Sequence, residues 1–203
     1  MKNKHKIKSL EALYKIIEIV PNNSKILDIG AGKLNVHANI FREAGFTVDT
    51  VDFFEESTYI GDFNQIQIKE KYDVIWASHC LEHQLNVNSF LKKIHNTLKP
   101  NGYVAITVPP LKHEIVGGHV NLWNGGLLIY NLILAGFDCS NIMIKKYDYN
   151  ISGIVRKTNS KIPEASLVYD SPDLITLKDF FPKKLSYRKN NIFDGDIESL
   201  NWT

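Results

Sequence analysis

The sequence has little cysteine and almost no charge imbalance, and each shortage excludes a class of protein. Two cysteines occur in 203 residues, Cys80 and Cys139, far apart and in apolar surroundings. Disulfide scaffolds and cysteine-based zinc or redox motifs need closer pairs, so we expect buried thiols in a reducing, cytoplasmic compartment. With 24 basic and 22 acidic residues the net charge is +2, too small to require a nucleic acid as partner.

Long uninterrupted hydrophobic runs are also lacking. Residues 115–137 contain no Asp, Glu, Lys or Arg and could span a bilayer by length, but glycines, asparagines and a histidine break up the stretch. We therefore expect a buried helix there and no membrane span. The basic N-terminus has Glu11, Lys15 and Glu18 within its apolar part, which favours an amphipathic helix over a signal peptide.

What is present is an alternation of strand-like and helix-like segments. Apolar residues at helical spacing predict helices over 9–20, 36–44, 87–98 and 127–135, and short apolar or β-branched runs predict strands over 25–29, 47–52, 72–77, 103–108, 142–149 and 151–157. Such alternation predicts an α/β fold with a mostly parallel sheet, helices on both faces and a closing antiparallel pair. We expect one domain over residues 1–157, including the N-terminal helix, and a C-terminal extension over 158–203 packed on it.

Polar and glycine residues follow the first two predicted strands. The first ends in Asp28-Ile29-Gly30-Ala31-Gly32, where glycines let the backbone turn sharply and approach a ligand closely. The second ends at Asp52, 20 residues beyond Gly32, which is where such folds place a carboxylate for ribose hydroxyls. Together these features indicate a ligand that contains adenosine.

The charge of the first strand end discriminates between such ligands. The dinucleotide fingerprint requires Gly or Ala three residues after its second glycine, and Asn35 stands there. Asp28 would repel a pyrophosphate but suits a ligand that carries an ammonium and a sulfonium. S-adenosylmethionine is such a ligand, and a nicotinamide-dependent oxidoreductase is the weaker alternative.

Five motifs occur in the order found in one enzyme family: ILDIGAG, VDF, GDF, YDVIWASHCLEH and LKPNGYVAITVP. With them the chain resembles the class I S-adenosylmethionine-dependent methyltransferases from about residue 25 to 157, including a Leu-Glu-His signature. The resemblance implies a Rossmann-like, seven-stranded sheet. Leu34 departs from the pattern, since many members carry a third glycine at that place.

The resemblance also implies a set of cofactor-binding residues. Asp28 and the backbone of Gly30, Ala31 and Gly32 would hold the methionine end, and Asp52 would bind the ribose. Asp62 would accept from the adenine amino group, Phe53 and Phe63 would flank the ring, and Ser78 or His79 would lie beside the methionine moiety. Simpler roles remain open: Asp52 as a strand-end cap, Asp62 as a turn former, and the phenylalanines as core residues.

Histidines supply the candidate catalytic groups. Methyl transfer needs alignment and, at most, a base for the acceptor proton, and histidine titrates near neutrality. His83 follows the predicted strand over 72–77, and His119 lies in the loop after the predicted strand over 103–108. Both are therefore predicted at the acceptor site, with structural roles as the alternative. His113 and His119 could also bind a metal, but no third ligand stands at suitable spacing, so no metal is expected.

The sequence thus predicts an S-adenosylmethionine-dependent methyltransferase that acts on a small molecule or a sugar or glycan precursor, at oxygen. An RNA or protein methyltransferase of the same fold is one alternative. A small basic cluster, at Lys2, Lys4, Lys6 and Lys8, is typical of a solvated terminus, and the charge balance is near neutral, so nucleic acid is not expected. A non-catalytic subunit that keeps the fold is the other alternative. The oligomeric state is left open.

Overall fold

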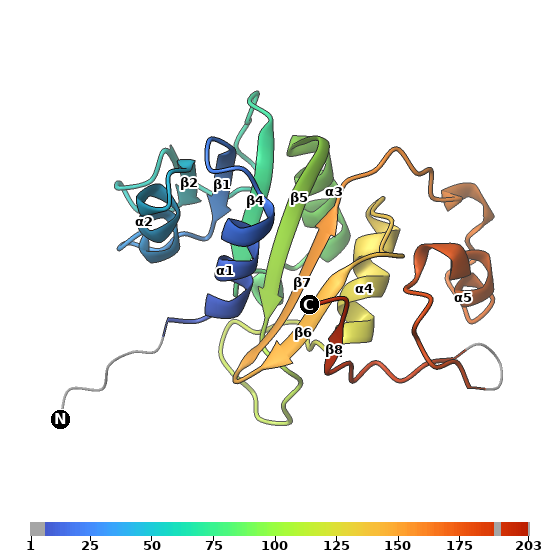
Figure 1. Cartoon of the computed structure of the whole chain (residues 1–203). Helices are drawn as coiled ribbons and strands as arrows, with labels where there is room; N and C mark the ends of the chain where they lie inside the picture. The colour runs from blue at the N-terminus through green and yellow to red at the C-terminus, as the bar shows by residue number, and fades with distance from the viewer. Residues whose placement is uncertain (1–6, 189–191, 203) are drawn as a thin grey trace.

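A computed structural model describes residues 7–188 and 192–202, and shows one sheet flanked by helices (Figure 1). Lys2, Lys4 and Lys6 of the basic cluster lie outside the described residues. The elements follow one another as α1 Leu10–Ile19, β1 Lys25–Ile29, α2 Val36–Glu43, β2 Thr47–Asp52, β3 Tyr59–Ile60, β4 Tyr72–Ser78, the 3-10 helix η1 Leu81–His83, α3 Val87–Thr97, β5 Leu98–Val108, α4 Gly125–Leu134, β6 Met143–Tyr147, β7 Asn150–Arg156, η2 Glu164–Ser166, α5 Asp173–Thr176, η3 Lys178–Phe180 and β8 Ser199–Leu200.

The sheet confirms the predicted α/β class. Its strand order is β3-β2-β1-β4-β5-β7-β6-β8; the first five strands run parallel, and β7 pairs antiparallel with both β5 and β6. The described residues form eight strands, so the expected number of seven is wrong. The two edge strands, β3 and β8, have two residues each and are too short to leave an alternating pattern in the sequence.

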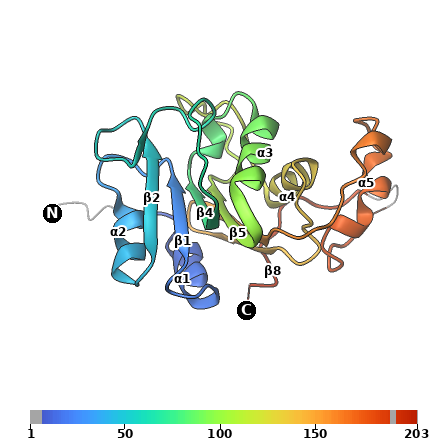
Figure 2. The ribbon, with the colours of Figure 1, turned by 90° about the horizontal axis from the view of Figure 1, so that it is seen from above.

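Helices cover both faces of the sheet, as Figure 2 shows from above. α1 and α2 pack on one face, where Leu13, Phe41 and Trp76 are buried together. α3 and α4 pack on the other, where the larger cluster contains Phe90 and Leu132. Because β1, β4 and β5 are buried on both faces, their sequences read as nearly continuous apolar runs rather than alternating ones.

Side-chain caps fix where two of the helices begin. The Asn86 side chain accepts a hydrogen bond from the Ser89 N–H at 3.0 Å, and Asn124 accepts from Leu127 N–H at 2.8 Å. The second cap starts α4 inside the stretch 115–137 that lacks charged residues. In the described part of the chain, no helix is both long and apolar enough to cross a membrane.

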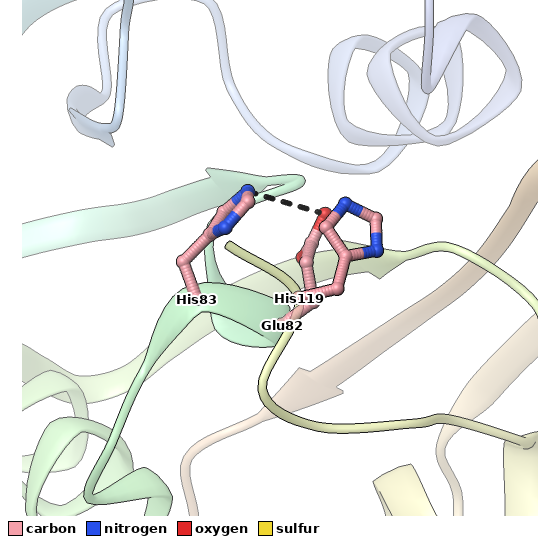
Figure 3. A group of neighbouring side chains, drawn as sticks. All are labelled: Glu82, His83 and His119. Carbon is pink, nitrogen blue, oxygen red and sulfur yellow. Dashed lines mark ion pairs between the residues drawn. The ribbon is translucent and has the colours of Figure 1, made fainter. Parts of the chain in front are cut away.

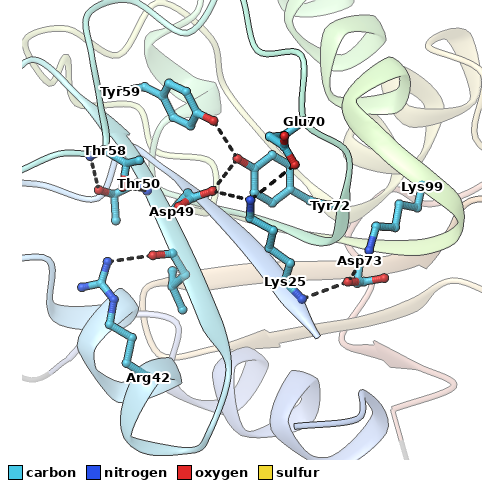
Figure 4. A network of polar contacts seen from close by, with 11 residues as sticks. Lys25, Arg42, Asp49, Thr50, Thr58, Tyr59, Glu70, Tyr72, Asp73 and Lys99 are labelled. Carbon is cyan, nitrogen blue, oxygen red and sulfur yellow. Dashed lines mark hydrogen bonds and ion pairs between the residues drawn. The ribbon is translucent and has the colours of Figure 1, made fainter. Parts of the chain in front are cut away.

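A polar network ties together the amino-terminal ends of β1 and β4, away from the carboxyl ends where ligands bind in such sheets (Figure 4). The Lys25 ammonium lies 3.0 Å from the Asp49 carboxylate, and the Tyr72 hydroxyl donates to the same carboxylate at 2.7 Å. The Lys25 backbone N–H donates to Asp73, which is also paired with Lys99 at 2.8 Å. These contacts hold the sheet without using residues at the opposite end.

The segment after residue 157 packs on the sheet and on α4. Its last strand, β8, pairs antiparallel with β6, and Leu177, Phe181 and Ile197 are buried in the larger cluster. Phe181 lies 6.0 Å from Tyr130 of α4 between ring centroids, and Trp202 lies 6.5 Å from Tyr147. These apolar anchors explain why short hydrophobic groups persist among the prolines of this segment.

Candidate functional site

A cavity of about 270 Å³ opens at the carboxyl ends of the parallel strands. Its walls come from the ends of β1 and β2, the turn after β3, the segment after β4, and the start of α3. The lining residues are Ile29, Gly30, Val51, Asp52, Phe53, Gly61, Asp62, Phe63, Cys80, His83, Gln84 and Phe90. This is the position at which open parallel sheets bind their ligands.

The glycine turn and Asp52 form one unit at the cavity mouth. The Asp52 carboxylate accepts the Gly32 N–H at 2.8 Å on one oxygen and the Phe53 N–H at 2.7 Å on the other. Each carboxylate oxygen can accept a further bond, so the group still has capacity for ligand hydroxyls. The Gly30 and Ala31 N–H groups donate to the Val51 carbonyl, at 2.9 and 3.4 Å. The N–H groups of the turn are therefore already hydrogen-bonded within the protein. The turn can let a ligand approach the backbone closely, but it has no unpaired N–H group to donate.

Glycine is required in this turn by its backbone conformation. Gly30 has φ of 74°, and a Cβ added there would lie 3.2 Å from the Cβ of Cys80. Gly32 has φ of 69° with open space around it. Both angles fall in the left-handed region that residues with a Cβ seldom adopt.

The residues predicted at the adenine position are near one another but differ in exposure. Asp62 accepts from the backbone N–H and side-chain amide of Asn64, at 2.9 and 3.0 Å, so it forms a turn as well as lining the cavity. Phe63 is buried, with its ring 5.3 Å from that of Phe90, whereas Phe53 is 74% exposed. Phe63 serves the core and the cavity wall together, and Phe53 is free to cover a ligand.

Asp28 lies beneath the turn and is fully enclosed. It receives a hydrogen bond from the backbone N–H of Ala38 in α2, while its Oδ2 atom has no partner. Burial is the main reason that its pKa is raised to about 7, and the nearby Asp52 adds to the effect. The carboxyl group would therefore respond to a positive charge placed above it.

Ser78 and His79 lie outside the lining of the cavity. The Ser78 hydroxyl is 2.6 Å from that of Ser9, at the start of α1. His79 adopts φ of 53°, an unusual conformation for a residue with a Cβ, and its Nε2 lies 2.9 Å from the Asn150 Oδ1. That Ser78 or His79 lies beside the methionine moiety of a bound cofactor therefore stays a prediction.

His83 and His119, far apart in sequence, are brought together (Figure 3). Their ring centroids are 5.0 Å apart in an edge-to-face arrangement, and His83 also lines the cavity. Glu82 lies next to both of them and is 1% exposed. Glu82, His83 and His119 each offer one potential metal-ligand atom, all within 4.8 Å of one another, whereas His113 is on the exposed part of the same loop.

Sequence reasoning named Glu82 only as part of the Leu-Glu-His signature and Cys80 only as a buried thiol, and it did not name Gln84. Cys80 is in fact partly exposed and lines the cavity. Glu82 stands among polar residues between a strand and a helix, so the sequence carries no sign that it is buried. Cys80 and Gln84 carry no sign of their place either, because they line the cavity only through the path of the chain after β4.

Comparison with known proteins places these features in a family. A family model described as a methyltransferase domain matches residues 7–131. No curated protein is similar enough in sequence to count as a match.

Three solved structures share the fold at low sequence identity. The 1,6-didemethyltoxoflavin-N1-methyltransferase of Burkholderia thailandensis, with bound 1,6-didemethyltoxoflavin and S-adenosylhomocysteine, is 19% identical, with a TM-score of 0.62 over 73% of this chain and 77% of that one. A SAM dependent methyltransferase from Archaeoglobus fulgidus is 17% identical, with a TM-score of 0.59 over 73% and 93% of the two chains. Phosphoethanolamine N-methyltransferase 2 of Haemonchus contortus, in complex with S-adenosyl-L-methionine, is 20% identical, with a TM-score of 0.55 over 66% of this chain and 37% of that one. These likenesses support the Rossmann-like fold.

Proposed function

The chain belongs to the methyltransferase domain family, and from that membership we propose that it transfers the methyl group of S-adenosylmethionine to a hydroxyl oxygen of a small polar acceptor, such as a sugar or glycan precursor. The observation that carries the proposal is the cavity at the carboxyl ends of β1, β2 and β4, with His83 in its wall.

The residues of the cavity fit the donor. Asp52 has free acceptor capacity at the mouth, and Asp62 stands across from it with apolar wall residues nearby. The Oδ2 atom of Asp28, beneath the turn, has no partner, and a cationic amino-acid end bound nearby would favour the ionised form of this carboxyl group, whose pKa burial raises to about 7. S-adenosylmethionine supplies, when bound, a methyl group on a sulfonium that leaves as a neutral thioether.

His83 supports oxygen as the target. Its Nδ1 atom is 2.8 Å from the Gly118 carbonyl, and a carbonyl oxygen only accepts, so in the neutral ring Nδ1 carries the proton. The Nε2 atom then has a free lone pair near the cavity. A hydroxyl must lose its proton during transfer, and this nitrogen, or that of the adjacent His119, is placed to assist.

The loop after β5 supports a small polar acceptor. It carries His119 and Asn121 next to Trp123, and together with Tyr149 these residues line a small second cavity. Aromatic faces combined with amide and imidazole groups are suited to hydroxylated rings more than to lipid tails.

Product analysis tests this proposal. The protein is incubated with S-adenosylmethionine and separate panels of sugars, phenols, amines, RNA and peptides, and S-adenosylhomocysteine and methylated products are followed by mass spectrometry. We expect turnover with a hydroxylated small molecule. Turnover only with amines, RNA or peptides would contradict the acceptor class, and binding of the donor without turnover on any panel would indicate a non-catalytic subunit.

A further inference from the structure

Glu82 is a buried carboxylate with too few partners. It is 1% exposed, and its Oε2 atom has no hydrogen-bond partner. Its Oε1 atom faces imidazole nitrogens, with His79 Nδ1 at 3.3 Å and His83 Nε2 at 3.9 Å. A buried carboxylate is costly unless a cation or several hydrogen bonds neutralise it. A positive charge next to the Oε2 atom would therefore stabilise the Glu82 carboxylate.

His83 presents a lone pair to the other oxygen of the same carboxylate, Oε1. The Gly118 carbonyl holds the Nδ1 proton, so Nε2 of the neutral ring is bare and points toward another electron-rich atom, the Glu82 oxygen (Figure 3). Two lone pairs that face each other repel, and either a proton or a metal cation between them removes the repulsion. Fixing the second ring nitrogen by a backbone carbonyl is also the usual support of a histidine that binds a metal.

The backbone brings His119 to these two residues. The Val120 and Asn121 N–H groups donate to the Glu82 carbonyl at 2.9 and 3.3 Å, which ties the loop after β5 to η1. His119 directly precedes them and follows Gly118, where an added Cβ would lie 3.1 Å from His83 Nδ1, so the glycine lets the loop approach His83 closely. Sequence spacing paired His119 with His113, but the fold pairs it with His83 instead.

We propose that Glu82, His83 and His119 bind a divalent transition-metal ion with zinc-like ligand preference. Two ligands about 2.1 Å from one tetrahedral ion lie roughly 3.4 Å apart. The 3.9 Å between Glu82 Oε1 and His83 Nε2 is slightly longer, and the three ligand atoms lie within 4.8 Å of one another, so small side-chain movements bring all three to one ion. Two imidazoles and a carboxylate favour zinc, iron or manganese over magnesium or calcium, and three protein ligands leave a coordination position open.

The open position gives the site a role in the reaction, and this step rests on the proposed function. His83 also lines the donor cavity, so the ion lies at the border between donor and acceptor. An acceptor hydroxyl bound to the ion has a lowered pKa and releases its proton to solvent. The alkoxide oxygen then forms the bond to the methyl carbon as the carbon–sulfur bond breaks, with its electron pair going to sulfur. His83 and His119 then act through the ion rather than as free bases.

Metal titration of the full chain tests the site. Protein treated with a chelator and dialysed is titrated calorimetrically with Zn²⁺ and Mn²⁺, with Mg²⁺ as comparison, and Co²⁺ is added to record the visible spectrum of the bound ion. We expect one ion per chain, and Glu82→Gln and His119→Ala to weaken binding at least tenfold, because loss of outer partners alone costs 10- to 100-fold. His113→Ala, in the same loop but exposed, is the matched control and should bind as the wild type does.

Three results overturn the proposal: no saturable binding of these ions, equal binding by the wild type and by both site variants, or selective binding of Mg²⁺. If Glu82→Gln fails to fold, the metal affinity of His119→Ala alone tests the site. This variant should fold, because the His119 side chain is partly exposed on a loop. Titration of the wild type with S-adenosylmethionine, beside its titration with metal ions, separates the two proposals. Donor binding with no metal binding by the wild type would overturn only the metal site, and metal binding without donor binding would overturn only the proposed function.

Discussion

The Asp52 carboxylate accepts a hydrogen bond from the Gly32 N–H at 2.8 Å, which joins the loops after the first two strands across the mouth of the cavity. The bond fixes the orientation of the carboxylate before any ligand binds. Preorganisation of this kind reduces the entropy lost on binding. The loop and the carboxylate therefore act as one binding element. A substitution in the loop should also alter the orientation of the Asp52 carboxylate, and a substitution of Asp52 should alter the loop.

Stability should depend on pH through Asp28. Its pKa is about 7 in the folded chain against an ordinary value of 3.8, so the folded state holds a proton that the unfolded state releases between these pH values. Stability contributed by the protonated group is full below pH 4 and is lost as pH rises toward 7, by at most roughly 4 kcal/mol.

Asp28→Asn should remove this dependence, since an amide does not titrate and still accepts from Ala38. We expect the variant to gain stability relative to the wild type as pH rises from 4 to 7, and the difference to level off above pH 7. Urea unfolding at pH 4, 5.5, 7 and 8 measures it. A difference that stays constant across this range would show that Asp28 titrates normally.

Two alanine substitutions in the glycine turn should differ in cost. Gly32→Ala introduces only left-handed backbone strain, about 1–2 kcal/mol, because nothing lies near the added Cβ. Gly30→Ala adds contact with Cys80 at 3.2 Å and should lower the free energy of unfolding further. Chemical denaturation of both variants checks the order, which equal or reversed losses would contradict.

Tyr72→Phe should lower stability without changing the cavity. The hydroxyl donates to Asp49 at 2.7 Å and lies 3.2 Å from the Tyr59 hydroxyl, at the end of the sheet opposite the site (Figure 4). A hydrogen bond to a charged group contributes roughly 1.5–3 kcal/mol. Thermal unfolding should show a loss of this order while the affinity for S-adenosylmethionine stays within twofold. A larger change in affinity would mean that the two ends of the sheet are coupled.

Much of the fold could be predicted because each long element carries a local signal. The apolar run before Gly30 predicted β1, the alternation up to Asp52 predicted β2, and the apolar run over 127–135 predicted α4, although this helix starts at Gly125, directly after the capping residue Asn124. β3 and β8 left no such signal, because two residues cannot show a period. Their pairing depends on neighbours distant in sequence.

The site was predictable only where it coincides with strand ends. Asp52, Asp62 and Phe63 follow strands or turns directly, and the structure brings them to one cavity. The contact between His83 and His119 depends on how the loop after β5 folds back onto η1, through bonds from Val120 and Asn121 that no spacing rule describes. Buried Glu82 could be recognised only once its surroundings were known.

Binding of S-adenosylmethionine to the wild type and to Asp52→Ala, measured by calorimetry, tests the central claim most directly. Asp49→Asn on the same strand is the matched control, because its carboxylate faces Lys25 and Tyr72 rather than the cavity. We predict saturable binding of S-adenosylmethionine and S-adenosylhomocysteine, a loss of at least tenfold in Asp52→Ala, and affinity in the control within twofold of the wild type. No binding by the wild type, or equal affinity in Asp52→Ala, would contradict the account.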